Sequence, residues 1–409
     1  MNHTRTPPAT AGLFGGLGEL FRAPAAPAVA LLAAALVAFV WANSPWREGY
    51  QALLAIPLQI GAGGSVLSKP ALLWINDGLM ALFFLMVGLE VKREVMGGAL
   101  SSARKAALPV AAALGGMLVP GLIYASFNLG GPGAPGWAIP MATDIAFALG
   151  VLALLGDRVP VSLKVFLAAF AVADDISAVT IIALFYTANL STTALLVAGG
   201  LTGLLVLLNR LGVRALGLYL LVGAALWLAV LKSGVHATVA GVVLALTVPL
   251  GDASARSPLI DLEHALHPWV SWCVLPIFAL ANAGVAVVGA QLNLLDPIAV
   301  GVAVGLVAGK LVGIPAMCWL AVRLDLAELP AGAGWLEIIA VGLLGGIGFT
   351  MSIFIAGLAF ADPVMLDTAK VGVLGGSLVA GTLGAGVLVW ASRRRDRVAE
   401  EGSFALAAK

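Results

Sequence analysis

Long apolar runs follow one another along almost the whole chain and are separated by short polar stretches. A transmembrane helix needs about 20 mostly apolar residues, and many of the runs reach or approach that length. The pattern therefore predicts an all-α polytopic membrane protein with about 12 transmembrane helices. The predicted spans cover residues 28–42, 71–91, 107–127, 136–155, 161–187, 193–209, 214–231, 235–250, 268–289, 297–322, 333–360 and 369–391.

Residues 51–70, between the first two spans, are too short and too interrupted to cross a membrane. The turn signal Gly61-Ala62-Gly63-Gly64 between two alternating stretches predicts a small β-hairpin there. The first apolar run could also be read as a signal peptide, but keeping it as a span gives a consistent topology. We therefore expect an N-terminal tail at 1–27, one transmembrane domain at 28–391 and a C-terminal tail at 392–409.

The composition supports a membrane protein and excludes several other classes. Hydrophobic residues make up 61% of the chain and charged residues 11%, with a mean hydropathy of +1.05. A soluble domain has about 25% charged residues, which it needs to cover its surface. The net charge of +1 leaves no basic face for nucleic acid. Cys273 and Cys318 both lie in apolar runs, which excludes a disulfide scaffold and a cysteine metal site.

The distribution of lysine and arginine predicts the orientation, because cytoplasmic loops carry the excess of basic residues. When the N-terminus is placed in the cytoplasm, 17 of the 22 basic residues fall on that side and four fall outside. The remaining one, Lys310, lies within a span. Both termini are therefore expected in the cytoplasm, with the hairpin outside.

Charged residues within the spans are the clearest sign of function. Asp144, Asp174, Asp175 and Lys310 all lie in apolar runs, and each would cost about 2.5–3.5 kcal/mol at the centre of a membrane helix. A structural ion pair would explain one acid and one base, but not three acids with one base.

Asp174 and Asp175 are adjacent, so on a helix their side chains point about 100° apart. The two therefore cannot share a single partner, and one can face a neighbouring helix while the other faces a cavity. Close carboxylates titrate as a coupled pair, and such a pair can hold either protons or a hard cation. Competition between the two is the chemistry of an exchanger.

Two spans contain helix-breaking residues. Pro140 and Thr143 interrupt the fourth span next to Asp144. The glycines of the run Gly345-Gly346-Ile347-Gly348 interrupt the eleventh span. Non-helical backbone within a membrane is tolerated where it is buried in protein or lines a wet cavity. Close helix packing through small residues is the alternative for the glycine run taken alone.

Six stretches of the chain carry longer motifs: NDGLMALFFLMVGLEVKREV (76–95), MATDIAFALG (141–150), FAVADDISA (170–178), LKSGVHATVAGV (231–242), LHPWVSWCVLPIFALANAGV (266–285) and GLLGGIGFTMSIFI (342–355). Together they closely resemble the NhaA family of bacterial sodium/proton antiporters, over roughly residues 28–391.

The resemblance implies an inverted-repeat antiporter fold, formed by spans 3–5 and 10–12. Its discontinuous spans, 4 and 11, would cross near the middle of the membrane, an arrangement for which these antiporters are themselves an established example. It also implies a pH-regulated secondary active transporter of the bacterial inner membrane, not an enzyme and without a cofactor. The transporter would export sodium or lithium in exchange for external protons, two per cation. Its partners would be these ions, the lipid bilayer and a second copy in a homodimer, with no nucleic acid.

The resemblance also assigns the ion site. It implies that Asp174 and Asp175 bind the metal cation and the protons, Asp175 more directly, beside Thr143 and Asp144 at the break of span 4. The matching lysine is Lys310, which would compensate charge together with Asp144. Half-helix ends carry partial charges of about half a unit. Asp144 can therefore balance N-terminal ends and Lys310 C-terminal ends, and Lys310 can pair with Asp174 when no cation is bound.

A second set of residues is associated with pH sensing through the same resemblance. For the members near the cytoplasmic face, a solvated basic loop is the alternative, above all for Lys92 and Glu94. For His236 the alternative is a hydrogen-bonded packing histidine. Ala265 stands where a larger aliphatic residue is expected, so the fine tuning of the pH response does not transfer. The set comprises Glu90, Arg93, Glu94, Glu263, His264, His267 and His236, and Lys92 belongs to the same cytoplasmic cluster.

Three other functions fit the sequence less well. A sodium-coupled solute symporter of similar fold would need a larger polar cavity, and few extra Asn, Gln or Arg residues are available to line one. An intramembrane hydrolase could use Asp174 and Asp175, or Ser233 with His236. Adjacent aspartates on one helix do not face each other as a protease pair must, although Asp144 could replace one of them. In a passive channel, Lys310 would repel cations.

Overall fold

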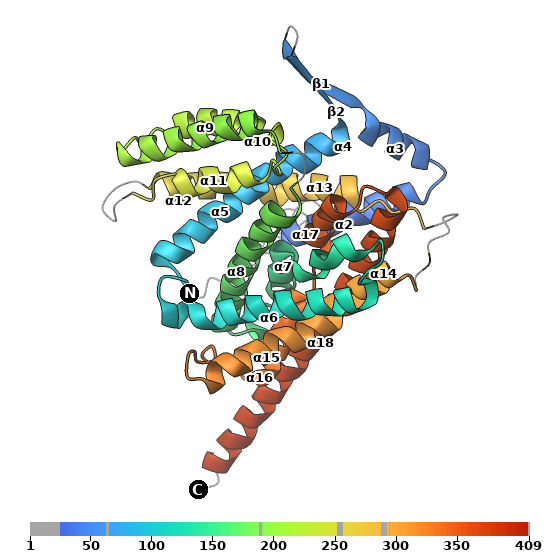
Figure 1. Ribbon diagram of the computed structural model, residues 1–409. Coiled ribbons are helices and arrows are strands. Elements are labelled where there is room, and N and C mark those ends of the chain that lie inside the picture. Colours follow the sequence, from blue (N-terminus) through green and yellow to red (C-terminus); the bar gives the residue numbers. More distant parts are fainter. Residues whose placement is uncertain are drawn as a thin grey trace, which may run out of the picture.

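The computed structural model describes residues 25–62, 65–187, 190–251, 257–287, 293 and 295–407, of which 60–62, 65–67 and 396–407 are described by their backbone alone. Helices dominate this part of the chain (Figure 1). A short helix, α3 (Arg47–Ala55), follows the first long helix, α2 (Ala26–Ala42), at a bend of 114°. With nine residues, about half of them polar, α3 is too short to cross a membrane by itself.

The predicted hairpin is confirmed. Strand β1 (Pro57–Ala62) pairs antiparallel with β2 (Ser65–Pro70), from Pro57 opposite Pro70 to Ala62 opposite Ser65. It projects beyond the helices at one end of the molecule (Figure 1). Lys69 of β2 forms an ion pair with Asp77 at 2.9 Å, which ties the hairpin to the helix that follows it.

Each of the twelve predicted spans contains helix, in the expected order. By length and apolar composition, eight helical segments of the described residues could cross a membrane, or up to ten if each of two bent pairs is one span. The remaining elements, in chain order, are α4 (Ala71–Trp74), η1 (Ile75–Leu79), α5 (Met80–Gly97), α6 (Ala103–Asn128), η2 (Ala134–Met141), α7 (Ile145–Leu155), η3 (Gly156–Arg158), α8 (Val161–Phe185), α9 (Thr192–Arg210), α10 (Leu216–Leu231), α11 (Val239–Thr247), α12 (Pro258–Trp269), η4 (Val270–Val274), α13 (Leu275–Asn282), α14 (Pro297–Val304), η5 (Gly305–Gly309), α15 (Lys310–Arg323), α16 (Trp335–Gly345), α17 (Phe349–Ala359) and α18 (Pro363–Ala407).

Some boundaries differ from the predictions. The span predicted at 235–250 is helical only in α11, which has nine residues, because the chain turns at Gly234 with φ of +86°. A helix of nine residues is about 14 Å long, roughly half the thickness of the hydrocarbon core. At the other extreme, α18 continues to Ala407, so residues assigned to the C-terminal tail are helical.

Three spans contain a π-helical turn that the sequence pattern did not predict. These turns are η1, η4 and η5, and η5 immediately precedes Lys310. A π-helical turn adds a residue to the helix and thereby rotates everything that follows it. The direction in which Lys310 points therefore depends on η5.

The helices pack into two groups around two apolar cores. Helices α9, α10, α11 and α12 share one core with Leu85 and Leu89 of α5. The larger core contains Phe83 and Phe84 from the same helix, together with residues of α2, α6, α8, α13 and the helices from α14 to α18. In Figure 1, α9, α10 and α11 lie side by side on one flank, with α6, α14 and α15 on another. Helix α5 therefore joins the two groups.

Helices α6 and α15 approach each other closely through two glycines. A Cβ at Gly115 would lie 2.0 Å from the carbonyl oxygen of Gly313, and a Cβ at Gly313 would lie 2.1 Å from that of Gly115. Neither backbone can yield, so only glycine permits this spacing. The contact fixes α15, the helix that begins with Lys310, against α6.

We expect Gly115→Ala to destabilise the protein by about 1–3 kcal/mol, because the added methyl group forces two helix backbones apart. The measurement is the apparent melting temperature in detergent. Gly199→Ala on α9 is the matched control, since nothing lies within 4 Å of its added Cβ. Equal melting temperatures for the two variants would contradict the role of this contact.

Candidate ion-binding site

The two interrupted spans meet at their breaks, as predicted. Residues 142–144 separate η2 from α7, and residues 346–348 separate α16 from α17, which are bent by 44°. The backbone N–H of Asp144 donates to the carbonyl of Ile347 at 2.6 Å, and the hydroxyl of Thr143 donates to the carbonyl of Gly345 at 2.8 Å. Backbone groups freed by each break are thus satisfied by the other break.

Asp144 caps the N-termini of two helices. One carboxylate oxygen accepts from the N–H of Phe147 in α7 at 3.0 Å, and the other from the N–H of Thr350 in α17 at 3.1 Å and from its hydroxyl. Its side chain is 2% exposed. A negative charge is stabilised at a helix N-terminus, and the Asp144 carboxylate lies at the N-termini of both α7 and α17. Charge compensation by Asp144 stays a prediction, and its position at these two helix ends is the one that such a role needs.

Two serines that the sequence pattern did not indicate complete the crossing. The hydroxyl of Ser377 in α18 accepts from the N–H groups of Gly348 and Phe349 at 3.2 and 3.1 Å. The hydroxyl of Ser352 donates to the carbonyl of Ile139 at 2.7 Å. A single serine in an apolar span can indicate a hydrogen bond to another helix. Serine also bonds to the backbone of its own helix, so the sequence does not identify its partner.

The breaking residues themselves have different surroundings. Pro140 lies in η2, and Gly345 ends α16. A Cβ at Gly346 would lie 2.3 Å from the carbonyl oxygen of Leu306, so the break packs directly onto η5. At Gly348 an added Cβ would meet the side chain of Ser352. Glycine is therefore needed at 346 because of backbone contact.

Lys310 is fully buried and lies among polar groups of the crossing. Its ammonium donates to the hydroxyl of Thr143 at 2.9 Å and lies 3.4 Å from both carboxylate oxygens of Asp174. The ring of Phe170 lies 5.6 Å away and contributes a cation–π contact. The ion pair expected between Lys310 and Asp174 is therefore present. Lys310 reaches the C-terminal end of α16 through Thr143, which in turn donates to Gly345.

Asp174 and Asp175 have contrasting surroundings, although they are neighbours on α8. Besides Lys310, Asp174 accepts the backbone N–H of Thr143 at 2.9 Å. The side chain of Asp175 is 3% exposed and makes no hydrogen bond or ion pair with any residue that the structure describes. It lies within electrostatic range of Asp174, Glu90 and Asp144, which repel it, and of Lys310, which attracts it. One carboxylate is paired and the other is free.

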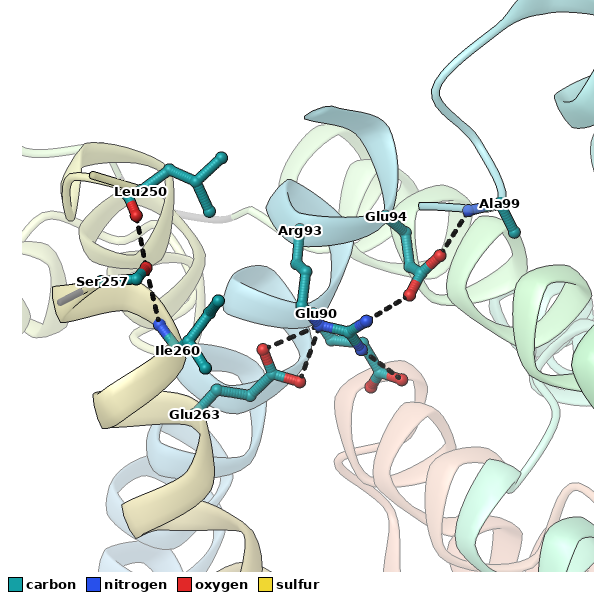
Figure 2. A network of polar contacts seen from close by, with 8 residues as sticks. All are labelled: Glu90, Arg93, Glu94, Ala99, Leu250, Ser257, Ile260 and Glu263. Atoms are coloured by element: carbon teal, nitrogen blue, oxygen red, sulfur yellow. Dashed lines mark hydrogen bonds and ion pairs between the residues drawn. The ribbon is translucent and has the colours of Figure 1, made fainter. Parts of the chain in front are cut away.

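A second polar cluster lies near the C-terminal end of α5 (Figure 2). The guanidinium of Arg93 contacts Glu263 at 3.0 Å, Glu94 at 2.6 Å and Glu90 at 4.0 Å. Glu94 also accepts the N–H of Ala99 at 2.6 Å. We call Arg93, Glu90, Glu94 and Glu263 the Arg93 network, and it joins α5 to α12.

Helix α12 carries Glu263 into the Arg93 network because its start is well defined. Ser257 caps the helix by accepting the N–H of Ile260 at 3.3 Å, and it donates to the carbonyl of Leu250 (Figure 2). Pro258 follows at the first helical position, where a missing N–H costs nothing.

The other residues associated with pH sensing lie apart from the Arg93 network. His264 and His267 are exposed and make no hydrogen bond or ion pair within the described part of the chain. Lys92 caps α11, donating to the carbonyls of Leu246 and Val248 at 2.7 Å each. His236 bonds Thr238 at 3.0 Å, and its ring stands edge-on to Phe354 at 5.4 Å.

Comparison with known proteins agrees with this architecture. A model of the Na+/H+ antiporter 1 family matches residues 18–388. A Na(+)/H(+) antiporter NhaA of Rhodospirillum rubrum is 55% identical over 394 residues, covering 93% of this chain and 98% of the relative. The proteins of the same name from Citrobacter koseri and Pseudomonas putida strain GB-1 are 54% and 53% identical. Those alignments cover 90% and 92% of this chain, and 96% and 97% of the relatives. The chain thus belongs to the Na+/H+ antiporter 1 family of secondary transporters.

Proposed function

We propose that the protein is an electrogenic antiporter in which sodium or lithium competes with protons for Asp174 and Asp175. The observation that carries this proposal is the contrast between the two carboxylates. Asp174 is paired with Lys310, whereas Asp175 is buried without a hydrogen bond or ion pair among the described residues. An unpaired carboxylate at this depth is costly, and binding either a proton or a cation removes that cost.

The proposed cation site uses oxygen ligands. Sodium is a hard cation that needs several oxygens to replace its water, and Asp175, Asp174 and the hydroxyl of Thr143 come from neighbouring positions on α8 and the first break. A cation at Asp175 would draw Asp174 away from Lys310. The buried lysine, left without its partner, would then release its proton. Release of the cation would let Asp175 and Lys310 each take up a proton and restore the ion pair with Asp174. Two protons per cation, a ratio that rests on the family resemblance, would move one net charge per cycle.

The space beside Asp174 favours small ions over an organic solute. The cavity that borders Asp174, with Ser177 and Met141 in its wall, has a volume of about 10 Å³. That is room for about one water molecule. A sodium-coupled solute symporter would need a far larger polar cavity beside the same carboxylates.

Asp175→Asn tests the site, because the change keeps size and one oxygen but removes the charge and the titratable proton. We expect the variant to lose both sodium binding and sodium-induced proton release. The measurement is calorimetry on detergent-solubilised protein at alkaline pH, in two buffers of different ionisation enthalpy, so that the released protons are counted.

Asp296→Asn is the matched control for this change. Asp296 is also an aspartate, but it caps α14 by accepting the N–H of Ile298 and is remote in sequence from the site. The control variant should bind sodium and release protons as the parent does. If Asp175→Asn also does so, the proposed site is wrong.

We further propose that the Arg93 network sets the pH at which exchange begins and does not bind the transported ion. Glu90 belongs to this network and lies within electrostatic range of Asp175. A change of charge in the network therefore alters the potential at the site without touching the ligands.

Glu263→Gln should shift the curve of activity against pH while leaving the maximal rate within a few-fold, because the charge acts on the site from a distance. The measurement is sodium-dependent pH change in liposomes over a pH series. Glu328→Gln is the control, since Glu328 also pairs with an arginine but is 80% exposed. Loss of exchange at every pH would instead place Glu263 in the ion site.

The orientation and the homodimer also belong to the proposal. The excess of basic residues on one side supports cytoplasmic termini and an external hairpin. The hairpin projects from the helices, and a two-stranded sheet has open backbone edges that a second copy could extend (Figure 1).

Gln59→Cys in β1 tests both features, because Gln59 is exposed. In intact cells we expect the new thiol to react with a membrane-impermeant maleimide and, under oxidation, to form a disulfide-linked dimer. The parent chain is the control, since its Cys318 is buried and its Cys273 is partly buried. Labelling only after permeabilisation would reverse the orientation, and absence of the dimer would argue against pairing through the hairpin.

A further inference from the structure

Arg395 holds together the outer ends of the two interrupted spans. Its guanidinium donates to the carbonyl of Arg158 at 2.7 Å and to the carbonyl of Gly332 at 3.3 Å. It also lies 3.5 Å from the carboxylate of Glu337. Arg158 ends η3, directly after α7, whereas Gly332 lies in the turn before α16 and Glu337 in its first turn. One side chain on α18 therefore contacts both the turn that follows α7 and the start of α16.

The chemistry of these contacts suits the helix ends. Glu337 is 5% exposed, and its second oxygen accepts the N–H of Gly334 at 2.9 Å, which caps α16. A carboxylate is favourable at a helix N-terminus, and a cation is favourable near a helix C-terminus. Arg395 thus places a positive charge at the C-terminal end that follows α7, near Arg158. It also forms an ion pair with Glu337, which caps the N-terminus of α16.

The inner ends of the same two half-helices form the crossing. Helix α7 begins at the Asp144 cap, and α16 ends at Gly345, which accepts the hydroxyl of Thr143. Each half-helix has 11 residues, a length of about 16 Å. Because a helix is stiff over that distance, movement of its outer end also moves its inner end.

We propose that Arg395 is a positioning residue for cation binding, acting through α7 and α16 on the crossing about 16 Å away. By tying both half-helices to α18, it keeps the groups around Asp144 and Thr143 in the arrangement that binds the cation. When a binding-competent arrangement is only partly populated, the apparent dissociation constant rises in inverse proportion to that population. Loss of Arg395 therefore weakens apparent cation affinity, whereas saturating cation restores the rate. This inference rests on the proposed exchange function.

The first test measures sodium-dependent exchange in liposomes over a range of sodium concentrations. Arg395→Gln should raise the KM for sodium about threefold or more, with the maximal rate within about twofold of the parent. Arg395→Lys keeps the charge but cannot reach all three partners, so its KM should be intermediate. The control is Arg393→Gln, because Arg393 is exposed and makes no hydrogen bond or ion pair with any described residue.

A double-mutant cycle separates positioning from general stability. Glu337→Gln can still cap α16 but loses the ion pair with Arg395, so it should raise the KM less than Arg395→Gln does. The variant with both changes should match Arg395→Gln alone, because the two residues act as one unit. A lower maximal rate with unchanged KM, or additive effects of the two changes, would overturn the proposal.

The second test does not depend on transport. Spin labels at Asp157 and Trp335, both exposed, report on the separation between the end of η3 and the start of α16. Arg395→Gln should broaden the distance distribution between the labels, and Arg393→Gln should leave it unchanged. Equal distributions in the two variants would overturn the inference even if the parent failed to exchange ions. Absence of exchange in the parent, with the broadening present, would instead refute only the proposed function.

Discussion

The structure depends on one constraint, which is that backbone groups freed by a broken helix inside a membrane must find partners within the protein. Each freed group left unsatisfied in lipid would cost several kcal/mol. The two breaks solve this together. Asp144 caps α7 and α17 at once, and its own N–H donates to Ile347 of the opposite break. Neither break would be tolerable without the other.

The packing of neighbouring helices follows from that crossing. The break at Gly346 lies against the backbone of Leu306, and α15 approaches α6 through Gly115 and Gly313. Between these contacts, η5 rotates the helix so that Lys310 reaches Thr143 and Asp174. The small residues let the helix backbones approach closely. This close approach brings the ammonium of Lys310 to the crossing and keeps it away from lipid.

The buried acids around the crossing are not paired equally with cations. In the proposed function, this difference between Asp174 and Asp175 is what allows exchange. Lys310 is committed to Asp174, so Asp175 has no cation of its own in the described structure. The Arg93 network lies close enough for Glu90 to influence Asp175 but contributes no ligand to it. At the outer ends of the interrupted spans, Arg395 pairs with Glu337 across two different helices. The frame is thus held at both ends of α7 and α16.

The local pattern of the chain determined which segments are apolar, where the hairpin turns, which charges are buried and where two spans break. Such features are encoded by neighbouring residues, as in Gly61-Ala62-Gly63-Gly64 or in the proline and acid around the break at Asp144. The sequence also placed Lys310 near Asp174, but only through resemblance to a family. It did not show that α11 is nine residues long or that three spans contain π-helical turns.

Only the tertiary structure decided how the polar groups are paired. It brought Ser377 to the N-terminus of α17 and Arg395 to Glu337, and it left His264 and His267 outside the Arg93 network. The physical reason is that a partner on another helix is chosen by crossing angle, rotation and close packing. These depend on contacts between segments far apart in the chain, which no local pattern of residues records.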